Sequence, residues 1–113
     1  MEIKWFTVSN DWMDKHEYLY GRGQANGYII IPKGHPWFGK DYMEIECDVH
    51  GGLTFGRYMN PDQIEHWSQF TDENLTDTYV YGFDTNHFGD NSVTWSLQHV
   101  IEETKRLAKQ AEI

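Results

Sequence analysis

Residues 97–111 carry apolar and small side chains at three- and four-residue spacing, with charged residues on the other side of the same stretch. Such a stripe is typical of a helix that buries one face. Glu102 and Arg106 are expected to form an i,i+4 ion pair on the opposite side. Lys105 and Lys109 favour the C-terminal end of the helix. A one-sided helix needs an apolar layer to pack on, and the strands predicted upstream supply it.

Three segments predict strands. Residues 28–31 read Tyr-Ile-Ile-Ile between Gly27 and Pro32, and residues 78–83 are rich in β-branched and aromatic side chains. In residues 43–50, apolar side chains alternate with Glu, Asp and His. This period of two predicts a strand with one buried and one solvent-facing side, and it puts His50 on the solvent side.

Residues 61–70 predict a short helix, with Asn60 as N-cap, Pro61 at the first helical position, and Ile64 and Trp67 three residues apart. With 113 residues the chain has the usual size of one domain. We therefore expect a single α+β domain over residues 1–113. Its expected architecture is an antiparallel sheet of about four to six strands with the C-terminal amphipathic helix packed across it.

The net charge of −9 is concentrated between residues 41 and 90, where eleven acidic residues face a single basic one, Arg57. This field disfavours direct contact with nucleic-acid phosphates and favours a basic protein surface or a cation, while solubility is the simpler interpretation. No stretch reaches the length of a membrane span, and the first residues do not resemble a signal peptide, so we expect a cytoplasmic protein. The single cysteine, Cys47, is expected to be a small buried apolar residue.

Two Gly-rich segments concentrate the reactive side chains: His50-Gly51-Gly52 and residues 82–90. In the second, Asp84, His87 and Asp90 are spaced by three. Together with His50 they could hold zinc, manganese or iron, and such an ion can activate water. A ring separation above about 12 Å between His50 and His87 would exclude a single ion. In the alternative interpretation, the carboxylates satisfy backbone donors in a loop and His87 packs on an aromatic ring.

Two further hypotheses concern binding without a metal. Backbone N–H groups at His50, Gly51 and Gly52 could cradle an anion, with Arg57 adding a contact to a phosphate and nearby aromatic rings stacking on a base. Asp48, on the same side of its predicted strand as His50, could orient the imidazole.

Trp37 and Phe38 lie in a loop, where they would form a hot spot for a partner if exposed. Folded inward, they would instead close one end of the sheet.

The strings His50-Gly51-Gly52-Leu53-Thr54 and Gly82-Phe83-Asp84, followed by His87 and Gly89-Asp90, resemble a group of small phage and prophage proteins without an assigned activity. The resemblance runs from Gly27 to the C-terminal helix. It implies an accessory protein that acts on the host, for instance by countering a defence factor.

The sequence supports two main functions, and a purely structural or homo-oligomeric phage component is a third possibility. The leading hypothesis is a non-enzymatic phage accessory protein that needs no cofactor and binds a host protein with a basic surface or a nucleotide-like ligand. The alternative is a hydrolase of nucleotides or phosphoesters that uses a divalent metal held by His50, Asp84, His87 and Asp90. The sequence does not decide between an enzyme and a binding protein, and it does not indicate an oligomeric state.

Overall fold

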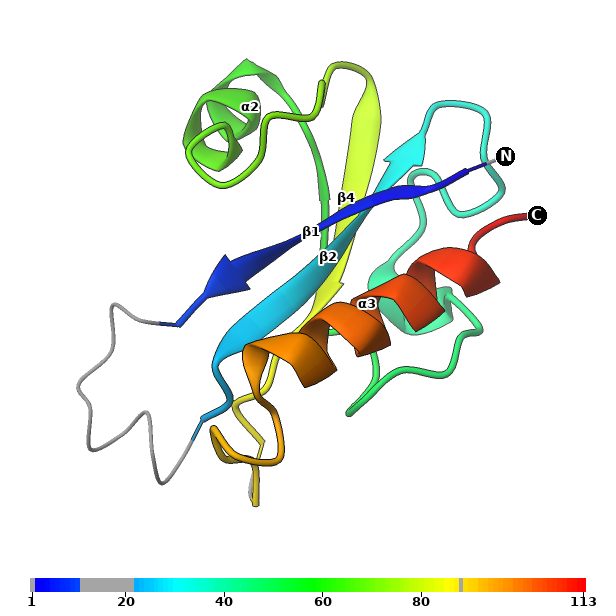
Figure 1. Ribbon diagram of the computed structural model, residues 1–113. Coiled ribbons are helices and arrows are strands. Elements are labelled where there is room, and N and C mark those ends of the chain that lie inside the picture. Colours follow the sequence, from blue (N-terminus) through cyan, green and yellow to red (C-terminus); the bar gives the residue numbers. More distant parts are fainter. Residues whose placement is uncertain (1, 11–21, 88) are drawn as a thin grey trace.

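Four antiparallel strands form one sheet in the computed structural model, which describes residues 2–10, 22–87 and 89–113 (Figure 1). The strands are β1 (Lys4–Ser9), β2 (Ala25–Pro32), β3 (Phe55–Tyr58) and β4 (Thr78–Phe83), in the spatial order β1-β2-β4-β3. The central pair, β2 and β4, runs from Gly27 opposite Phe83 to Pro32 opposite Thr78. The predicted α+β class and antiparallel sheet are confirmed.

Two helices pack on this sheet. Helix α2 (Pro61–Trp67) begins after Asn60, whose side chain accepts a hydrogen bond from the Gln63 N–H at 2.9 Å. Helix α3 (Leu97–Gln110) begins after Ser96 and lies across β1 and β2. Both predicted helices are therefore confirmed. None of the helices in the described part of the chain is long and apolar enough to cross a membrane.

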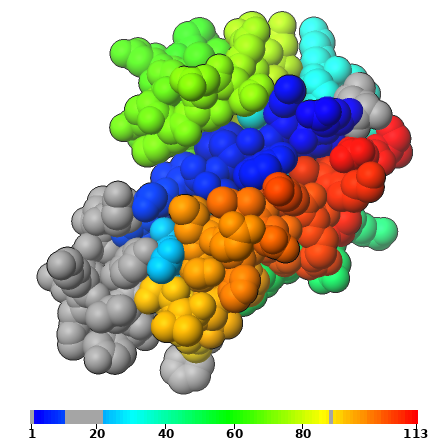
Figure 2. Space-filling view, in the orientation of Figure 1, coloured from blue at the N-terminus to red at the C-terminus, as the bar shows by residue number. Residues whose placement is uncertain are grey.

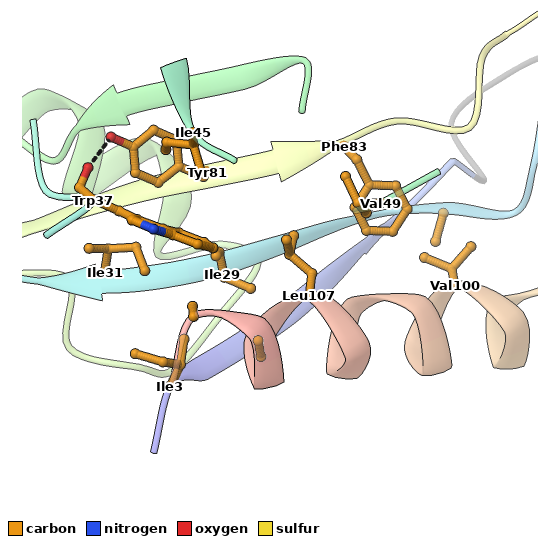
Figure 3. Close-up of a cluster of buried hydrophobic side chains, with 13 residues drawn as sticks. Ile3, Ile29, Ile31, Trp37, Ile45, Val49, Tyr81, Phe83, Val100 and Leu107 are labelled. Atoms are coloured by element: carbon orange, nitrogen blue, oxygen red, sulfur yellow. Dashed lines mark hydrogen bonds between the residues drawn. The ribbon is translucent and has the colours of Figure 1, made fainter. Parts of the chain in front are cut away.

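The two helices cover opposite faces of the sheet. On one face, alternate residues of β2 and β4 pack against α3, as Ile29, Phe83 and Leu107 do in Figure 3. On the other face, Val80 of β4 belongs to a second cluster with Trp67 of α2. In the space-filling view, the surface of β1 is visible between the α2 region and α3 (Figure 2). The alternation along each central strand thus divides the core into two layers.

The predicted strand over residues 43–50 is wrong. The segment starts as a 3-10 turn, η1 (Tyr42–Glu44), and continues as extended chain outside the sheet, with Met43 77% exposed. Ile45 and Val49 are nonetheless buried, as the alternation requires. The Gln110 side chain on α3 accepts a hydrogen bond from the Asp48 N–H and donates one to the Asp48 carbonyl, both at 2.7 Å. An amide side chain of the helix therefore supplies hydrogen bonds that a neighbouring strand would have made.

Candidate metal centre

His50 lies in a tight turn that directs its ring away from the core. The turn is closed by a hydrogen bond from the Gly52 N–H to the Val49 carbonyl at 2.9 Å. Gly51 and Gly52 both have positive φ, 69° and 77°, which glycine adopts without steric cost. Val49 points into the core beside Phe83 (Figure 3), whereas the His50 side chain is 24% exposed. The glycine pair therefore forms a turn that ends the segment before it.

Asp90 organises the second Gly-rich segment. Its Oδ2 accepts a hydrogen bond from the His87 N–H at 2.9 Å and lies 2.9 Å from His87 Nδ1. Asp84 accepts a hydrogen bond from the Asn86 N–H at 3.1 Å, and its Oδ1 lies 3.5 Å from His87 Nε2. Phe88, which belongs to this segment, lies outside the described residues. Both carboxylates therefore hold the loop in shape while remaining next to an imidazole.

The two Gly-rich segments meet at the Asp90 carboxylate. His50 Nε2 lies 2.9 Å from Asp90 Oδ1, and the His50 and His87 rings stand edge to face with centroids 5.0 Å apart. This separation is well below the roughly 12 Å that would exclude a shared ion. Because an ionised carboxylate only accepts hydrogen bonds, both rings donate to Asp90: His50 through Nε2–H and His87 through Nδ1–H.

The pKa of Asp90 is lowered from its usual value. Burial acts to raise this pKa, since the side chain is only 5% exposed, but the hydrogen bonds from the His87 backbone, the His87 ring and the His50 ring outweigh it. The carboxylate therefore remains charged in a nearly closed environment, which suits it to hold a cation.

The two imidazole rings are fixed by their neighbours. A Cβ atom on Gly51 would lie 2.3 Å from His87 Cε1, so the His87 ring packs directly on the Gly51 backbone. The Trp95 ring lies over His50, with centroids 4.0 Å apart and planes 31° from parallel. The loop leading into α3 thus contributes a wall to the site.

Glu103 of α3 also contacts the site, and sequence reasoning missed it. Its Oε2 accepts a hydrogen bond from the His50 N–H at 2.7 Å. Arg106 donates to both Glu103 carboxylate oxygens at 2.9 Å and to Asp48 Oδ2 at 3.1 Å. The predicted ion pair between Glu102 and Arg106 is therefore replaced by Arg106 with Glu103 and Asp48. Helical spacing allows the i,i+3 pair of Arg106 with Glu103, but it could not reveal the contacts of these side chains with Asp48 and the His50 N–H, which lie in another segment.

His50, His87 and Asp90 form a group that could hold a metal ion, with one ligand atom from each lying within 4.8 Å of the others. Two imidazole nitrogens and a carboxylate oxygen suit zinc and other first-row metals. The structure thus brings together three of the four predicted ligands. Asp84 lies beside the outer nitrogen of His87, at the rim of this group.

The proposed phosphate cradle is not assembled. Arg57 pairs with Val80 across the β3–β4 ladder, so it lies on the sheet face covered by α2, whereas His50 is held against α3 on the other face. Within the glycine turn, the N–H groups of His50 and Gly52 already donate to Glu103 and to the Val49 carbonyl. Gly51 and Gly52 form the turn, and Gly51 also lets the His87 ring pack against its backbone.

The structure also bears on the predicted roles of Asp48 and Trp37. Asp48 pairs with Arg106 and does not orient His50, whose ring is held by Asp90. Trp37 is only 8% exposed and belongs to the core, so the inward-folded alternative applies to it.

Phe38 is partly buried and meets the rings of Tyr58 and Tyr79 edge to face. Neither Trp37 nor Phe38 therefore forms the exposed aromatic hot spot that was one of the two predicted arrangements.

Cys47 is half-buried beside the core, and burial raises the pKa of its thiol.

Comparison of the chain with protein-family models, with curated proteins and with solved structures gives no match. What the site binds must therefore be inferred from its own chemistry.

Proposed function

We propose that this protein binds a divalent first-row transition-metal ion through His50, His87 and Asp90. The observation that carries the proposal is the convergence of three suitable ligand atoms, within 4.8 Å of one another, from two segments far apart in the chain. Hydrogen bonds to Asp90 already aim one nitrogen of each ring at a common centre. On binding, the ion replaces the two imidazole protons between these rings and the carboxylate.

The donor set favours zinc over magnesium or calcium, because neutral imidazole prefers borderline metals and the two harder ions prefer oxygen ligands. The His50 and His87 side chains are 24% and 32% exposed, so an ion can reach the site from solvent. Asp90, which is buried, contributes a negative charge from the side of the site that faces the protein interior. A water molecule completes the coordination in this proposal, while Asp84 lies beside His87 Nε2, where it can accept a hydrogen bond from the nitrogen that does not bind the ion.

Isothermal titration of Zn²⁺ into tag-free, metal-stripped protein tests the site. We expect one ion per chain. His87→Ala and Asp90→Ala should each weaken binding by more than the roughly 10- to 100-fold that follows from changing a residue behind a ligand. His66→Ala is the matched control, because His66 is an exposed histidine of α2 outside the cluster. No heat of binding with the wild type, or equal loss in the control, would refute the proposal.

A metal with three protein ligands keeps a coordination position for water, which is the arrangement of catalytic zinc sites. Hydrolysis of nucleotides or phosphoesters is therefore the catalytic form of this proposal. The Zn²⁺-loaded and Mn²⁺-loaded proteins are to be assayed with nucleoside triphosphates and with an aryl phosphodiester. Turnover that disappears in His87→Ala and persists in His66→Ala supports a hydrolase, and stoichiometric binding without turnover leaves a binding protein.

A second candidate function is binding of a basic host protein, as expected of a phage accessory protein. It is favoured by the exposure of nine of the eleven carboxylates between residues 41 and 90. They are Asp41, Glu44, Glu46, Asp48, Asp62, Glu65, Asp72, Glu73 and Asp77. Such a surface attracts cationic partners, and the attraction weakens with salt.

A pulldown at low and high salt tests this candidate, using wild type and a Glu65→Lys/Asp72→Lys variant. Capture of one basic protein that is lost with the variant and reduced by salt supports it. Retention of the same partner by the variant, or no partner at low salt, argues against it.

A further inference from the structure

The position of His50 is set by helix α3. The segment before His50 has no partner strand among the described residues, so side chains of α3 provide its anchors. Gln110 holds the backbone of Asp48 by two hydrogen bonds of 2.7 Å. Two residues further on, Glu103 accepts the hydrogen bond from the His50 N–H, also at 2.7 Å. The helix thus reaches the segment at two separate points.

Glu103 is itself held in place. Arg106 binds both of its carboxylate oxygens, a bidentate geometry that fixes the plane of the carboxylate. The Glu103 side chain is 13% exposed, and the Arg106 guanidinium lowers the pKa of Glu103, so the group is charged. A fixed, charged acceptor therefore receives the N–H of the residue whose ring enters the candidate metal centre.

The two ends of His50 are held by different elements. Its ring is bound to Asp90 of the β4–α3 connection, and its backbone is bound to Glu103 of α3. Loss of the ring contact alone would leave the turn in place. Loss of the backbone contact would free the turn to move the ring relative to His87, which is fixed by its own loop. The distance between the two imidazoles therefore depends on Glu103.

We propose that Glu103 is a positioning residue for the metal centre, an inference that rests on the proposed binding of a divalent ion by His50, His87 and Asp90. Groups behind metal ligands orient them, and changing such a group typically lowers affinity by about 10- to 100-fold. Glu103 acts through the backbone of a ligand instead of through its ring. By thermodynamic reciprocity, an ion bound at the centre strengthens the contact between the His50 turn and α3.

Zn²⁺ titration of the full chain tests the role of Glu103. Glu103→Ala should bind Zn²⁺ about 10-fold or more weakly than wild type, whereas Glu103→Gln, which keeps an acceptor oxygen, should retain most of the affinity. If Glu103→Ala does not fold by circular dichroism, Glu103→Asp serves in its place, because the shorter side chain cannot hold both Arg106 and the His50 N–H.

Gln110→Ala is the matched control: it releases the same segment from α3 at Asp48 and leaves the His50 hydrogen bond in place. Unchanged stoichiometry with selective loss of affinity in Glu103→Ala or Glu103→Asp supports the inference. An equal loss in Gln110→Ala overturns it, because the loss then reflects a general loosening of the segment. Wild-type affinity in Glu103→Ala or Glu103→Asp also overturns it. Failure of the wild type to bind Zn²⁺ is a different result and refutes the proposed function itself.

Discussion

The Asp90 carboxylate lies 2.9 Å from His50 Nε2, although the two residues are 40 positions apart in the chain. The same carboxylate binds the ring and the backbone N–H of His87. One buried acidic group thus joins two loops and orients two imidazoles. Without a metal it is a structural clamp, and with one it is a ligand, so the same side chain should govern both the stability of the chain and its affinity for a cation.

Gly51 and Gly52 form a matched pair for testing the glycine turn. Both have positive φ, so alanine at either should cost about 1–2 kcal/mol of unfolding free energy. Only at Gly51 does the new Cβ meet the His87 ring; at Gly52 it meets open space. We therefore expect Gly51→Ala to lose Zn²⁺ affinity and Gly52→Ala to keep it. Urea denaturation and Zn²⁺ titration of both variants give the comparison, and equal affinity in the two would contradict the packing of His87 on Gly51.

The pKa values of Asp90 and Glu103 are both lowered in the fold, so the unfolded chain binds protons at these groups more readily than the native state. Their contribution to stability is full above the unfolded pKa values of about 4 and is lost as the pH falls through the lower folded values. Urea denaturation of metal-free protein should therefore show a steep loss of stability below about pH 4.5. Asp90→Asn should flatten this dependence.

Asp90→Asn should also be less stable than wild type near pH 7, by about 1–3 kcal/mol, because its amide nitrogen cannot accept the hydrogen bonds that the carboxylate receives. Asp62→Asn, at an exposed position in the first turn of α2, is the control and should keep the wild-type pH profile. If the unfolding free energy of Asp90→Asn ran parallel to that of wild type at every pH, Asp90 would not be the group whose protonation destabilises the fold.

The elements of the sheet and helices that follow local rules could be predicted from the sequence. The apolar run of β2, the Asn60 cap of α2 and the one-sided pattern of α3 each determine their structure within a few residues. The strand predicted over residues 43–50 was wrong because alternation indicates which side chains are buried and does not indicate which groups hydrogen-bond to the backbone. Gln110, more than 60 residues away, supplies that pairing, and no local pattern indicates it.

The ligands of the candidate site could be predicted from the sequence, but the residues that hold those ligands in place could not. Spacing by three within one loop singled out His87 and Asp90, and the glycine turn singled out His50. Glu103 and Trp95 contact His50 only because α3 and its preceding loop fold back over the turn. The edge strand β1 received no prediction, although Lys4–Ser9 contains aromatic and β-branched residues and buries Phe6.

Tyr81 closes the end of the core through its hydroxyl, which donates to the carbonyls of Trp37 and Lys40, each at 2.6 Å. Burial raises the pKa of this tyrosine, so the hydroxyl keeps its proton. Tyr81→Phe should destabilise the protein by about 1–2 kcal/mol, because buried carbonyls lose their donor. Tyr79→Phe, at the ring stacked on Tyr81, is the control. Urea denaturation should show a smaller effect for Tyr79→Phe and no change in Zn²⁺ affinity for either variant.

Trp95 should report metal binding by its fluorescence. Its ring stacks on His50 at 4.0 Å, so a paramagnetic ion such as Cu²⁺ at the centre would lie next to this indole. Titration with Cu²⁺ should quench part of the emission of wild type, and Trp95→Phe should lose most of that change while still binding the ion by calorimetry. Trp67→Phe is the control, because Trp67 packs on the opposite face of the sheet. Quenching that persists in Trp95→Phe and disappears in Trp67→Phe would place the ion away from His50, since quenching of this kind requires proximity to the indole.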